Sequence, residues 1–406
     1  MTTPISLGGP RTGPLQGIRV ADFSAVFSGP IAAAMLADQG ADVIKVEAFG
    51  GDLMRKGYPQ SNGMASAFTS MNRNKRGISL NLQTDQGKAA AKRLIESADV
   101  VLENFRPGVM DRLGLGYEVF KAKQPKLVYA SINGVGATGP YANRRVYDAV
   151  IQAISGFTAL RVDGKPEMVN SLVCDKITSL TAAEAIVAAL FRAERTGQGQ
   201  RVDISMLDAA ISFLWPDTMN NFTFMDPGIE PVAPLDHSIF LHETRDGWIA
   251  SMPVQESEFF GVFRALELPE LVEDSRFQNA AARLEHRSEL RALMDEAYPQ
   301  FSTDQLCQRF EEEDVPYSRL NSREEVLSDP QVEAMGALLS YQHPAAGLVR
   351  TPRPAAQFEQ TPSNLYTHTP LLGEHTDEVL QELGYTLDDL ERMEKDQVIL
   401  RSSSDL

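Results

Sequence analysis

Short apolar segments alternate with amphipathic segments over the first half of the chain. Residues 17–23 and 41–47 are apolar enough to form strands, and residues 31–39 between them carry an Ala-rich face that stops at Gly40. A strand, a tight helix and a second strand within about 30 residues form a βαβ unit. Because such a crossover leaves its two strands parallel, the pattern predicts a parallel sheet.

The same pattern recurs further along the chain. Residues 88–97 and 178–196 show the apolar spacing of helices, and residues 99–103, 127–132 and 200–206 have the composition of strands. This alternation indicates an α/β fold with a large, open, Rossmann-like parallel sheet.

The pattern changes near residue 215. The Pro-rich segments 226–234 and 345–362 are typical of linkers, and a hairpin turn at Asp246-Gly247 marks a smaller α+β unit between them. Further helices are expected at 376–383 and from Thr386, where a capping box carries Asp389 in place of Glu. We expect a loose N-terminal extension, a large α/β domain, a linker, a small α+β domain, and a second linker with C-terminal helices, at residues 1–14, 15–215, 216–239, 240–325 and 326–406.

Charge and composition narrow the class of protein. The 406 residues include 38 Lys and Arg against 55 Asp and Glu, a net charge of −17, so nucleic acid and anionic membrane are not expected partners. No apolar run reaches the roughly 18 residues of a membrane span, and residues 1–14 lack the apolar core of a signal peptide, so we expect a cytoplasmic protein. The two cysteines, Cys174 and Cys307, and the absence of an HExxH pair argue against a disulfide framework or a metal site.

The first strand–turn–helix is a candidate nucleotide site. Its turn reads Ser24-Ala-Val-Phe-Ser-Gly-Pro30, which lacks the GxGxxG fingerprint, and Pro30 removes one N–H that would hold a pyrophosphate. A conventional NAD site is therefore not expected.

Positive charge gathers in three short segments. Each alone could be a solvated loop, but all follow predicted strands or turns close to strands, on the side where open α/β sheets bind ligands. Together they favour a phosphate-bearing ligand. Phe105 and Tyr147 lie nearby in sequence and could pack on an adenine or pantetheine, although core packing is the commoner fate of such residues. The basic residues are Arg73, Lys75 and Arg76, then Arg106 and Arg112, then Arg144 and Arg145.

Asp175 precedes the long helix predicted from residue 178. An Asp at a helix N-terminus commonly acts as a cap. The same placement stabilises an ionised carboxylate by roughly 0.3–1 kcal/mol, and a positioned carboxylate is what covalent catalysis through an acyl anhydride needs. Cys174 has no His nearby in sequence to activate it, which favours a structural role for this thiol.

Several long segments of the chain resemble, in order, the class III CoA-transferase family, which includes formyl-CoA transferase and carnitine CoA-transferase. The similarity runs from about Pro14 to Ile399. Its N-terminal segments are LQGIRVADFSAVFSGP, GADVIKVEAFGGD, NRNKRGISLNL, ENFRPGVMDRLGLGYE, VYDAVIQAISG and RTGQGQRVDISMLDA. Its C-terminal segments are RDGWIA, LELPELVEDSRF, VPYSRL and LLGEHTDEVLQELG.

This resemblance implies a particular architecture. Residues 15–215 would form a large CoA-binding α/β domain, completed by the return of residues 326–406, with the small domain inserted between linkers. Two chains would interlock as a homodimer. The substrates would be an acyl-CoA and a carboxylic acid, with no permanently bound cofactor and no metal.

The resemblance also implies site residues. Asp175 would attack the acyl-CoA thioester to give an aspartyl anhydride and then an aspartyl-CoA thioester, with succinyl-CoA as the expected donor. The positions that match the family's CoA contacts are Phe27, Ser28, Ala48, Leu80, Asn104, Phe105, Arg106, Arg112, Arg145, Tyr147 and Asp148. Of these, Asn104, Phe105, Arg112 and Tyr147 carry the expected residue types.

Some positions depart from the family pattern. Phe27 replaces a glutamine of formyl-CoA transferase, Ala48 replaces an arginine, and residues 221–237 lack a run of glycines, so another acyl group than oxalyl or formyl is expected. The α-methylacyl-CoA racemases share the fold but have His at the position of Tyr147, whose reference pKa of about 10 makes it a poor base. Two further functions stay open: intramolecular CoA transfer, and CoA binding without catalysis, in which Asp175 only caps a helix.

Overall fold

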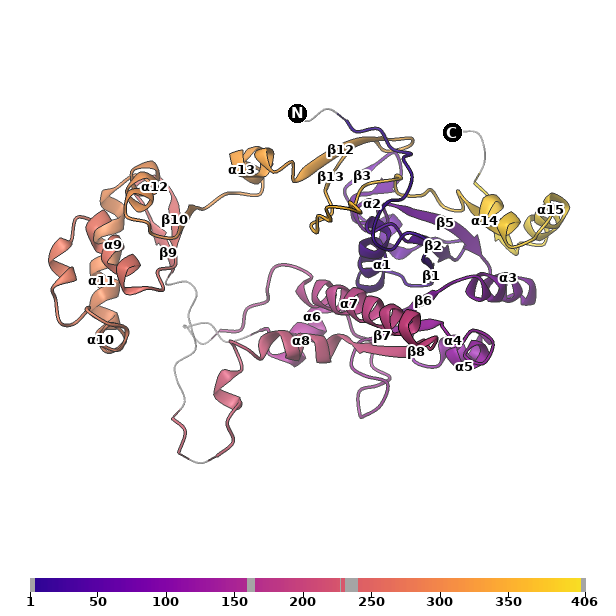
Figure 1. Ribbon diagram of the computed structural model, residues 1–406, viewed down its shortest axis with the longest axis horizontal. Helices are drawn as coiled ribbons and strands as arrows, with labels where there is room; N and C mark the ends of the chain where they lie inside the picture. The colour runs from indigo at the N-terminus through magenta and orange to yellow at the C-terminus, as the bar shows by residue number, and fades with distance from the viewer. Residues whose placement is uncertain (1–3, 159–164, 227, 231–239, 403–406) are drawn as a thin grey trace. The chain divides into compact units, whose positions relative to one another are not determined.

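The computed structural model describes residues 4–158, 165–226, 228–230 and 240–402. By its internal packing the chain divides into two units (Figure 1). The larger unit combines Met1–Met225 with Met335–Leu406, and the smaller unit is Asp226–Ala334.

The larger unit is built on one sheet. Among the described residues it has seven strands in the order β14-β5-β2-β1-β6-β7-β8, and all neighbours are parallel except β14, which runs antiparallel to β5. The predicted α/β fold with a parallel sheet is confirmed. The strands are β1 (Arg19–Asp22), β2 (Asp42–Glu47), β5 (Lys75–Leu80), β6 (Val100–Glu103), β7 (Val128–Asn133), β8 (Gln200–Ser205) and β14 (Ile399–Leu400).

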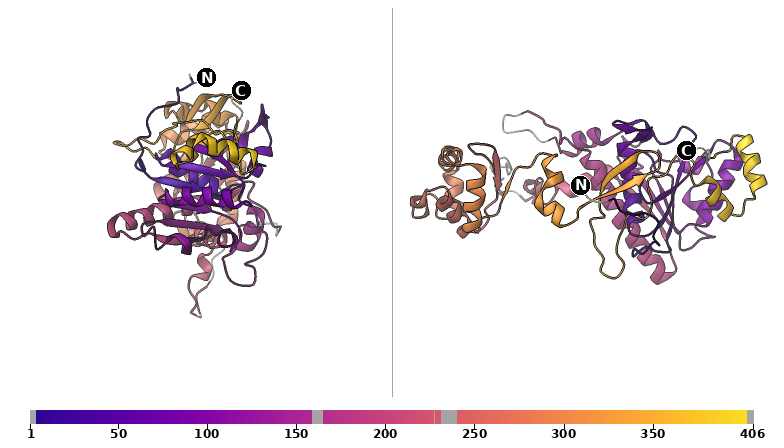
Figure 2. Two further views of the ribbon diagram at one scale, coloured as in Figure 1. Left: turned by 90° about the vertical axis from the view of Figure 1, so that its right-hand side faces the viewer. Right: turned by 90° about the horizontal axis from the view of Figure 1, so that it is seen from above.

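Helices cover both faces of this sheet, because its strands are apolar on both faces. Val20 and Ala21 are neighbours on β1 and enter different cores. One core includes residues of α3 (Asp85–Glu96), α14 (Thr376–Glu382) and α15 (Leu387–Lys395). The other includes residues of α1 (Ser28–Asp38), α6 (Asp148–Ser155), α7 (Val173–Thr196) and α8 (Met206–Leu214). In the right-hand view of Figure 2, the yellow helices α14 and α15 lie on one side of the strands and the magenta α7 on the other.

The strand order reverses beside β1. β2 and β5 lie on one side of it, whereas β6, β7 and β8 lie on the other. Open α/β sheets bind ligands at such a switch point, in the crevice beyond the carboxyl ends of the strands. Here the segments that leave those ends are Ser24–Phe27 after β1 and Asn104–Pro107 after β6.

Two helices begin earlier than the sequence pattern predicts. α1 begins at Ser28 instead of residue 31, since a Pro at its third position, Pro30, breaks no helical hydrogen bond. α7 begins at Val173 instead of residue 178, so Asp175 lies within its first turn. The predicted capping box at Thr386 is confirmed: its hydroxyl accepts from the N–H of Asp389, whose carboxylate accepts from the Thr386 N–H.

The remaining elements of the larger unit are short. They are η1 (Leu53–Lys56), β3 (Gln60–Ser61), β4 (Met64–Ala65), α2 (Ser66–Met71), α4 (Val109–Arg112), α5 (Tyr117–Phe120), η2 (Asn220–Phe222) and the hairpin β12 (Leu338–His343) with β13 (Gly347–Pro352).

The smaller unit has its own aromatic core around Phe263, Phe277 and Phe310. Its three-stranded antiparallel sheet includes the predicted hairpin at Asp246-Gly247. The elements are β9 (Leu241–Glu243), β10 (Trp248–Ser251), β11 (Tyr317–Arg319), α9 (Glu256–Ala265), η4 (Pro269–Val272), α10 (Ala280–Glu285), α11 (Arg287–Ala297), η5 (Tyr298–Gln300), α12 (Thr303–Glu312), η6 (Glu325–Ser328) and α13 (Pro330–Ala334).

Candidate active site

Three helix N-termini meet around Asp175. This residue is the third of α7, and its backbone N–H donates to the Oδ2 atom of Asp148, the first residue of α6, over 3.0 Å. Its carboxylate accepts hydrogen bonds from the hydroxyl and the backbone N–H of Ser28, the first residue of α1. Helix N-termini stabilise negative charge. Ser28 belongs to α1 and Asp175 to α7, so the Asp175 carboxylate does more than cap its own helix.

The environment of Asp175 changes its acidity. Burial is the largest cause and the neighbouring Asp148 carboxylate the second, and together they raise the pKa of Asp175 to about 6 against the opposing hydrogen bonds of Ser28. The group is therefore ionised at neutral pH yet poorly solvated, which suits a nucleophile. Burial, followed by the charges of Asp148 and Asp175, raises the pKa of the adjacent Cys174 thiol to about 12, so this thiol stays protonated.

Asn104 joins the two segments at the switch point. Its Oδ1 atom accepts from the N–H of Ala25 over 2.9 Å, and its Nδ2 atom donates to the carbonyl of Ala25 over 2.8 Å. This two-bond contact connects the segment after β6 with the turn that leads into α1. The structure thus brings together four of the predicted site residues, Ser28, Asn104, Asp148 and Asp175, through direct contacts or the Ser24–Ser28 turn.

One predicted basic segment forms ion pairs within the chain. Lys75 lies inside the protein with its ammonium 3.0 Å from the carboxylate of Asp22, and Arg73 pairs with Asp38. Arg76 pairs with Asp42 and with two glutamates on α14. These ion pairs within the chain favour a structural role for the segment over the predicted phosphate contact, which stays a prediction.

The other predicted contacts fall on two kinds of position. Phe105 packs partly buried against the apolar core, Phe27 is half-buried at the start of α1, and Leu80 is buried in β5. The remaining predicted contacts lie exposed on segments that follow strands or precede α6, and they are Ala48, Arg106, Arg112, Arg145 and Tyr147.

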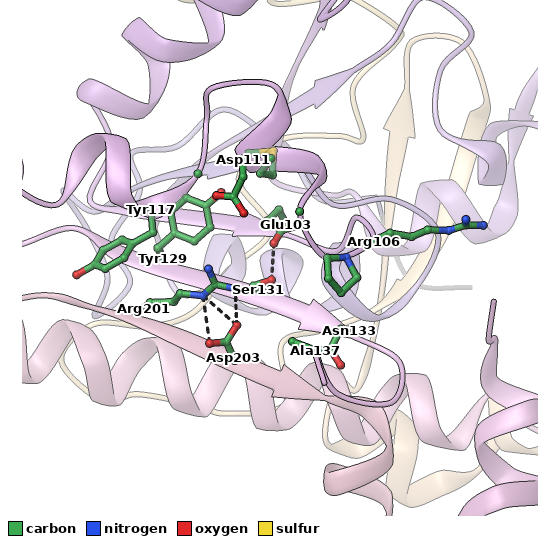
Figure 3. A pocket seen from close by; sticks show the side chains of 14 residues that line it. Glu103, Arg106, Asp111, Tyr117, Tyr129, Ser131, Asn133, Ala137, Arg201 and Asp203 are labelled. Carbon is green, nitrogen blue, oxygen red and sulfur yellow. Dashed lines mark hydrogen bonds and ion pairs between the residues drawn. The ribbon is translucent and has the colours of Figure 1, made fainter. Parts of the chain in front are cut away.

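A small polar cavity lies beside the segment after β6 (Figure 3). Glu103, at the end of β6, bonds to the Ser131 hydroxyl and accepts the N–H of Phe105 over 2.8 Å. Burial raises the pKa of Glu103 despite these bonds. Arg201 and Asp203 form an ion pair on its other wall, and Arg106 extends away from the Glu103–Ser131 pair. Sequence reasoning missed Glu103, although a Glu that ends an apolar strand directly before Asn104 was a usable signal.

Within the described ranges, no helix combines the length and the apolar character that crossing a bilayer requires. The same residues contain no group of three or more His, Cys, Asp or Glu side chains placed to hold a metal ion.

Known proteins are similar to this chain in sequence and in fold. Residues 15–376 match the profile of CoA-transferase family III. A succinate–glutarate CoA-transferase from Agrobacterium fabrum is 35% identical over 92% of this chain and 96% of its own length. A formyl-CoA:oxalate CoA-transferase from Shigella sonnei is 31% identical over 95% of this chain and 99% of its own.

Solved structures agree with this grouping. A CAIB/BAIF family protein from Brucella suis superposes with a TM-score of 0.79 at 32% identity, covering 92% of this chain and all of that one. These matches agree with the site, in which a carboxylate lies between helix N-termini close to the switch-point segments. The chain belongs to CoA-transferase family III.

Proposed function

We propose that this enzyme moves CoA from succinyl-CoA to a small dicarboxylic or hydroxycarboxylic acid through a covalent intermediate on Asp175. The observation that carries the proposal is the desolvated Asp175 carboxylate, oriented by Ser28 and placed beside the switch point. The choice of substrates rests on relatives of similar length that are named succinate–glutarate and succinyl-CoA:glutarate CoA-transferases.

The proposed reaction needs neither a metal nor a redox change. An oxygen of Asp175 attacks the thioester carbonyl, the C–S bond breaks, and an aspartyl–succinyl anhydride and CoA thiolate form. The thiolate attacks the aspartyl carbonyl and releases succinate. The acceptor carboxylate then attacks the aspartyl-CoA thioester, and the released thiolate attacks the acceptor acyl group, which restores Asp175. Each step exchanges one carboxylate or thiolate for another, so no proton is gained or lost.

The CoA would bind along the switch-point segments. Asn104 and Phe105 lie directly after β6, and the exposed guanidinium groups of Arg112 and Arg145 are free to approach the phosphates. Such local positive charge is needed because the chain as a whole carries a net charge of −17.

We propose that the enzyme acts as a homodimer. Support comes from an apolar stripe along α7, where Leu180, Val187 and Phe191 remain 59%, 37% and 63% exposed. Residues 180, 187 and 191 follow the seven- and four-residue spacing of one helix face. Exposed apolar side chains on one helix face, interrupted here by the exposed Glu184, are typical of a surface covered by a partner, and a second copy of the chain is the partner that we propose.

Intact-protein mass spectrometry with a panel of acyl-CoAs tests the proposed nucleophile. Wild type should gain a CoA-sized mass that hydroxylamine removes, and Asp175→Ala should gain none. The matched control is Asp208→Ala, because Asp208 is the third residue of α8, as Asp175 is of α7, and is exposed. An adduct on Asp175→Ala would contradict the proposal. Exchange of an α-proton of a branched acyl-CoA in deuterated water, with no adduct in wild type, would favour racemase activity.

A further inference from the structure

The turn Ser24–Ser28, which delivers Ser28 to Asp175, has an unusual backbone. Val26 has a φ of 71°, in the left-handed region. A β-branched residue rarely adopts this conformation, and when it does the surrounding structure must hold it there.

Buried side chains hold the turn from the sheet side. The Asp52 carboxylate lies 3.2 Å from the N–H of Val26 and 3.0 Å from the ammonium of Lys45, and both charged side chains are only 1% exposed. The same ammonium donates to the carbonyl of Ser24 over 2.9 Å. The Lys45–Asp52 pair thus holds the turn through two backbone groups on either side of Ala25, the Ser24 carbonyl and the Val26 N–H.

A single hydroxyl holds the other end of the turn. Ser179 lies one helical turn after Asp175 on α7, and its Oγ atom is 2.8 Å from the carbonyl of Ser28 and 2.7 Å from the carbonyl of Asp175. It therefore links Ser28, the first residue of α1, to Asp175, whose carboxylate Ser28 contacts. Ser179 is fully buried, so no water competes for this bridge.

We infer that Lys45, Asp52 and Ser179 are positioning residues, which fix the Ser24–Ser28 turn so that the Ser28 donors meet the Asp175 carboxylate. None of the three touches that carboxylate through its side chain in a described contact. The left-handed conformation of Val26 bends the turn so that Ser28 points towards Asp175. The Lys45–Asp52 pair and the Ser179 hydroxyl keep the turn in this conformation. This inference rests on the proposed role of Asp175 as nucleophile.

The test compares the rate of CoA-adduct formation in variants of each holding residue. Ser179→Ala should lower this rate and kcat by about tenfold and Asp52→Ala by about a hundredfold, because a reacting group displaced by about 1 Å loses rate on that scale. KM for the acyl-CoA should change by a smaller factor than kcat does, since Arg112 and Arg145, the proposed phosphate contacts, are untouched. Ser179→Thr and Asp52→Asn each retain an oxygen at the contact and should recover most of the rate.

Matched controls separate positioning from general loss of stability. Thr181→Ala removes a hydroxyl of α7 that bonds to the carbonyl of Ile177, and Asp38→Ala breaks a buried ion pair with Arg73 at the far end of α1. Both should keep kcat within about twofold of wild type. If Ser179→Ala matches Thr181→Ala in kcat, the inference is wrong, and this holds even where Asp52→Ala does not fold. A wild type that forms no adduct would instead refute the proposed function.

Discussion

At the scale of single residues, Asp175 is a group that costs stability. Its pKa of about 6 in the folded chain lies above its ordinary value of 3.8, so the folded state binds its proton more tightly than the unfolded state does. The stabilisation from this proton is complete below about pH 4 and is lost as the pH rises through 6. Raising the pKa of Asp175 from 3.8 to about 6 corresponds to about 3 kcal/mol as an upper bound.

Asp175→Asn should therefore raise the free energy of unfolding by about 1–3 kcal/mol at pH 8 and leave it nearly unchanged at pH 4. Urea unfolding at the two pH values measures both quantities. Asp208→Asn, on the exposed first turn of α8, serves as the matched control. An equal gain at pH 4 and pH 8 would mean that charge is not the cause.

The same titration should appear in the reaction. Only the ionised carboxylate attacks a thioester, so the single-turnover rate of adduct formation should rise with pH and reach half its maximum near pH 6. Asp148→Asn removes the second-largest cause of the raised pKa and should move this midpoint to lower pH. If the midpoint is unchanged in Asp148→Asn, a group other than Asp175 causes the rise of the rate with pH.

At the scale of elements, β5 shows how one residue can belong to the core and to a predicted site at once. The Leu80 side chain is buried, and its backbone is paired with Ile399 of β14. We expect Leu80→Ala to destabilise the protein by about 2–4 kcal/mol through the cavity it leaves. Leu387→Ala, at an exposed position of α15, should change stability by less than about 0.5 kcal/mol.

Activity separates the two roles of Leu80. If its side chain serves the core, KM for the acyl-CoA in folded Leu80→Ala should stay within about twofold of wild type. Calorimetric melting temperatures and steady-state kinetics on both variants provide the measurement. A large rise in KM without loss of stability would assign the side chain to binding.

The elements also show what a sequence pattern can and cannot predict. The strands and helices of the α/β core were predictable because apolar periodicity is a local property. The buried pair of Lys75 and Asp22 was not, since it joins residues on different strands that meet only in the folded sheet. The start of α7 was missed for a related reason: its first turn is fixed by contacts with Asp148 and Ser28, which belong to other helices. The position of Asp175 at the start of a helix was predicted from the residue pattern, whereas its role as nucleophile came from the family resemblance and stays a prediction.

At the scale of the whole molecule, the α7 stripe predicts the oligomeric state. Light scattering should give a mass of about twice 44.6 kDa, and Phe191→Asp should weaken the association because it places a charge in the proposed interface. Leu348→Asp changes an equally exposed leucine on β13 and should leave the mass unchanged. A monomeric wild type at micromolar concentration would contradict the proposed dimer.

The antiparallel strand β14 has a consequence for the order in which the protein is made. It completes the sheet edge beside β5, yet Ile399 leaves the ribosome long after its partner Leu80. The smaller unit, by contrast, comes from one continuous stretch, Asp226–Ala334. During translation all residues of the smaller unit are therefore available before those of the larger unit are complete. Until β14 has been made, the edge of β5 in the larger unit stays unpaired, and an unpaired strand edge promotes aggregation. The residues of β14, which are translated after the smaller unit, thus complete the sheet of the larger unit.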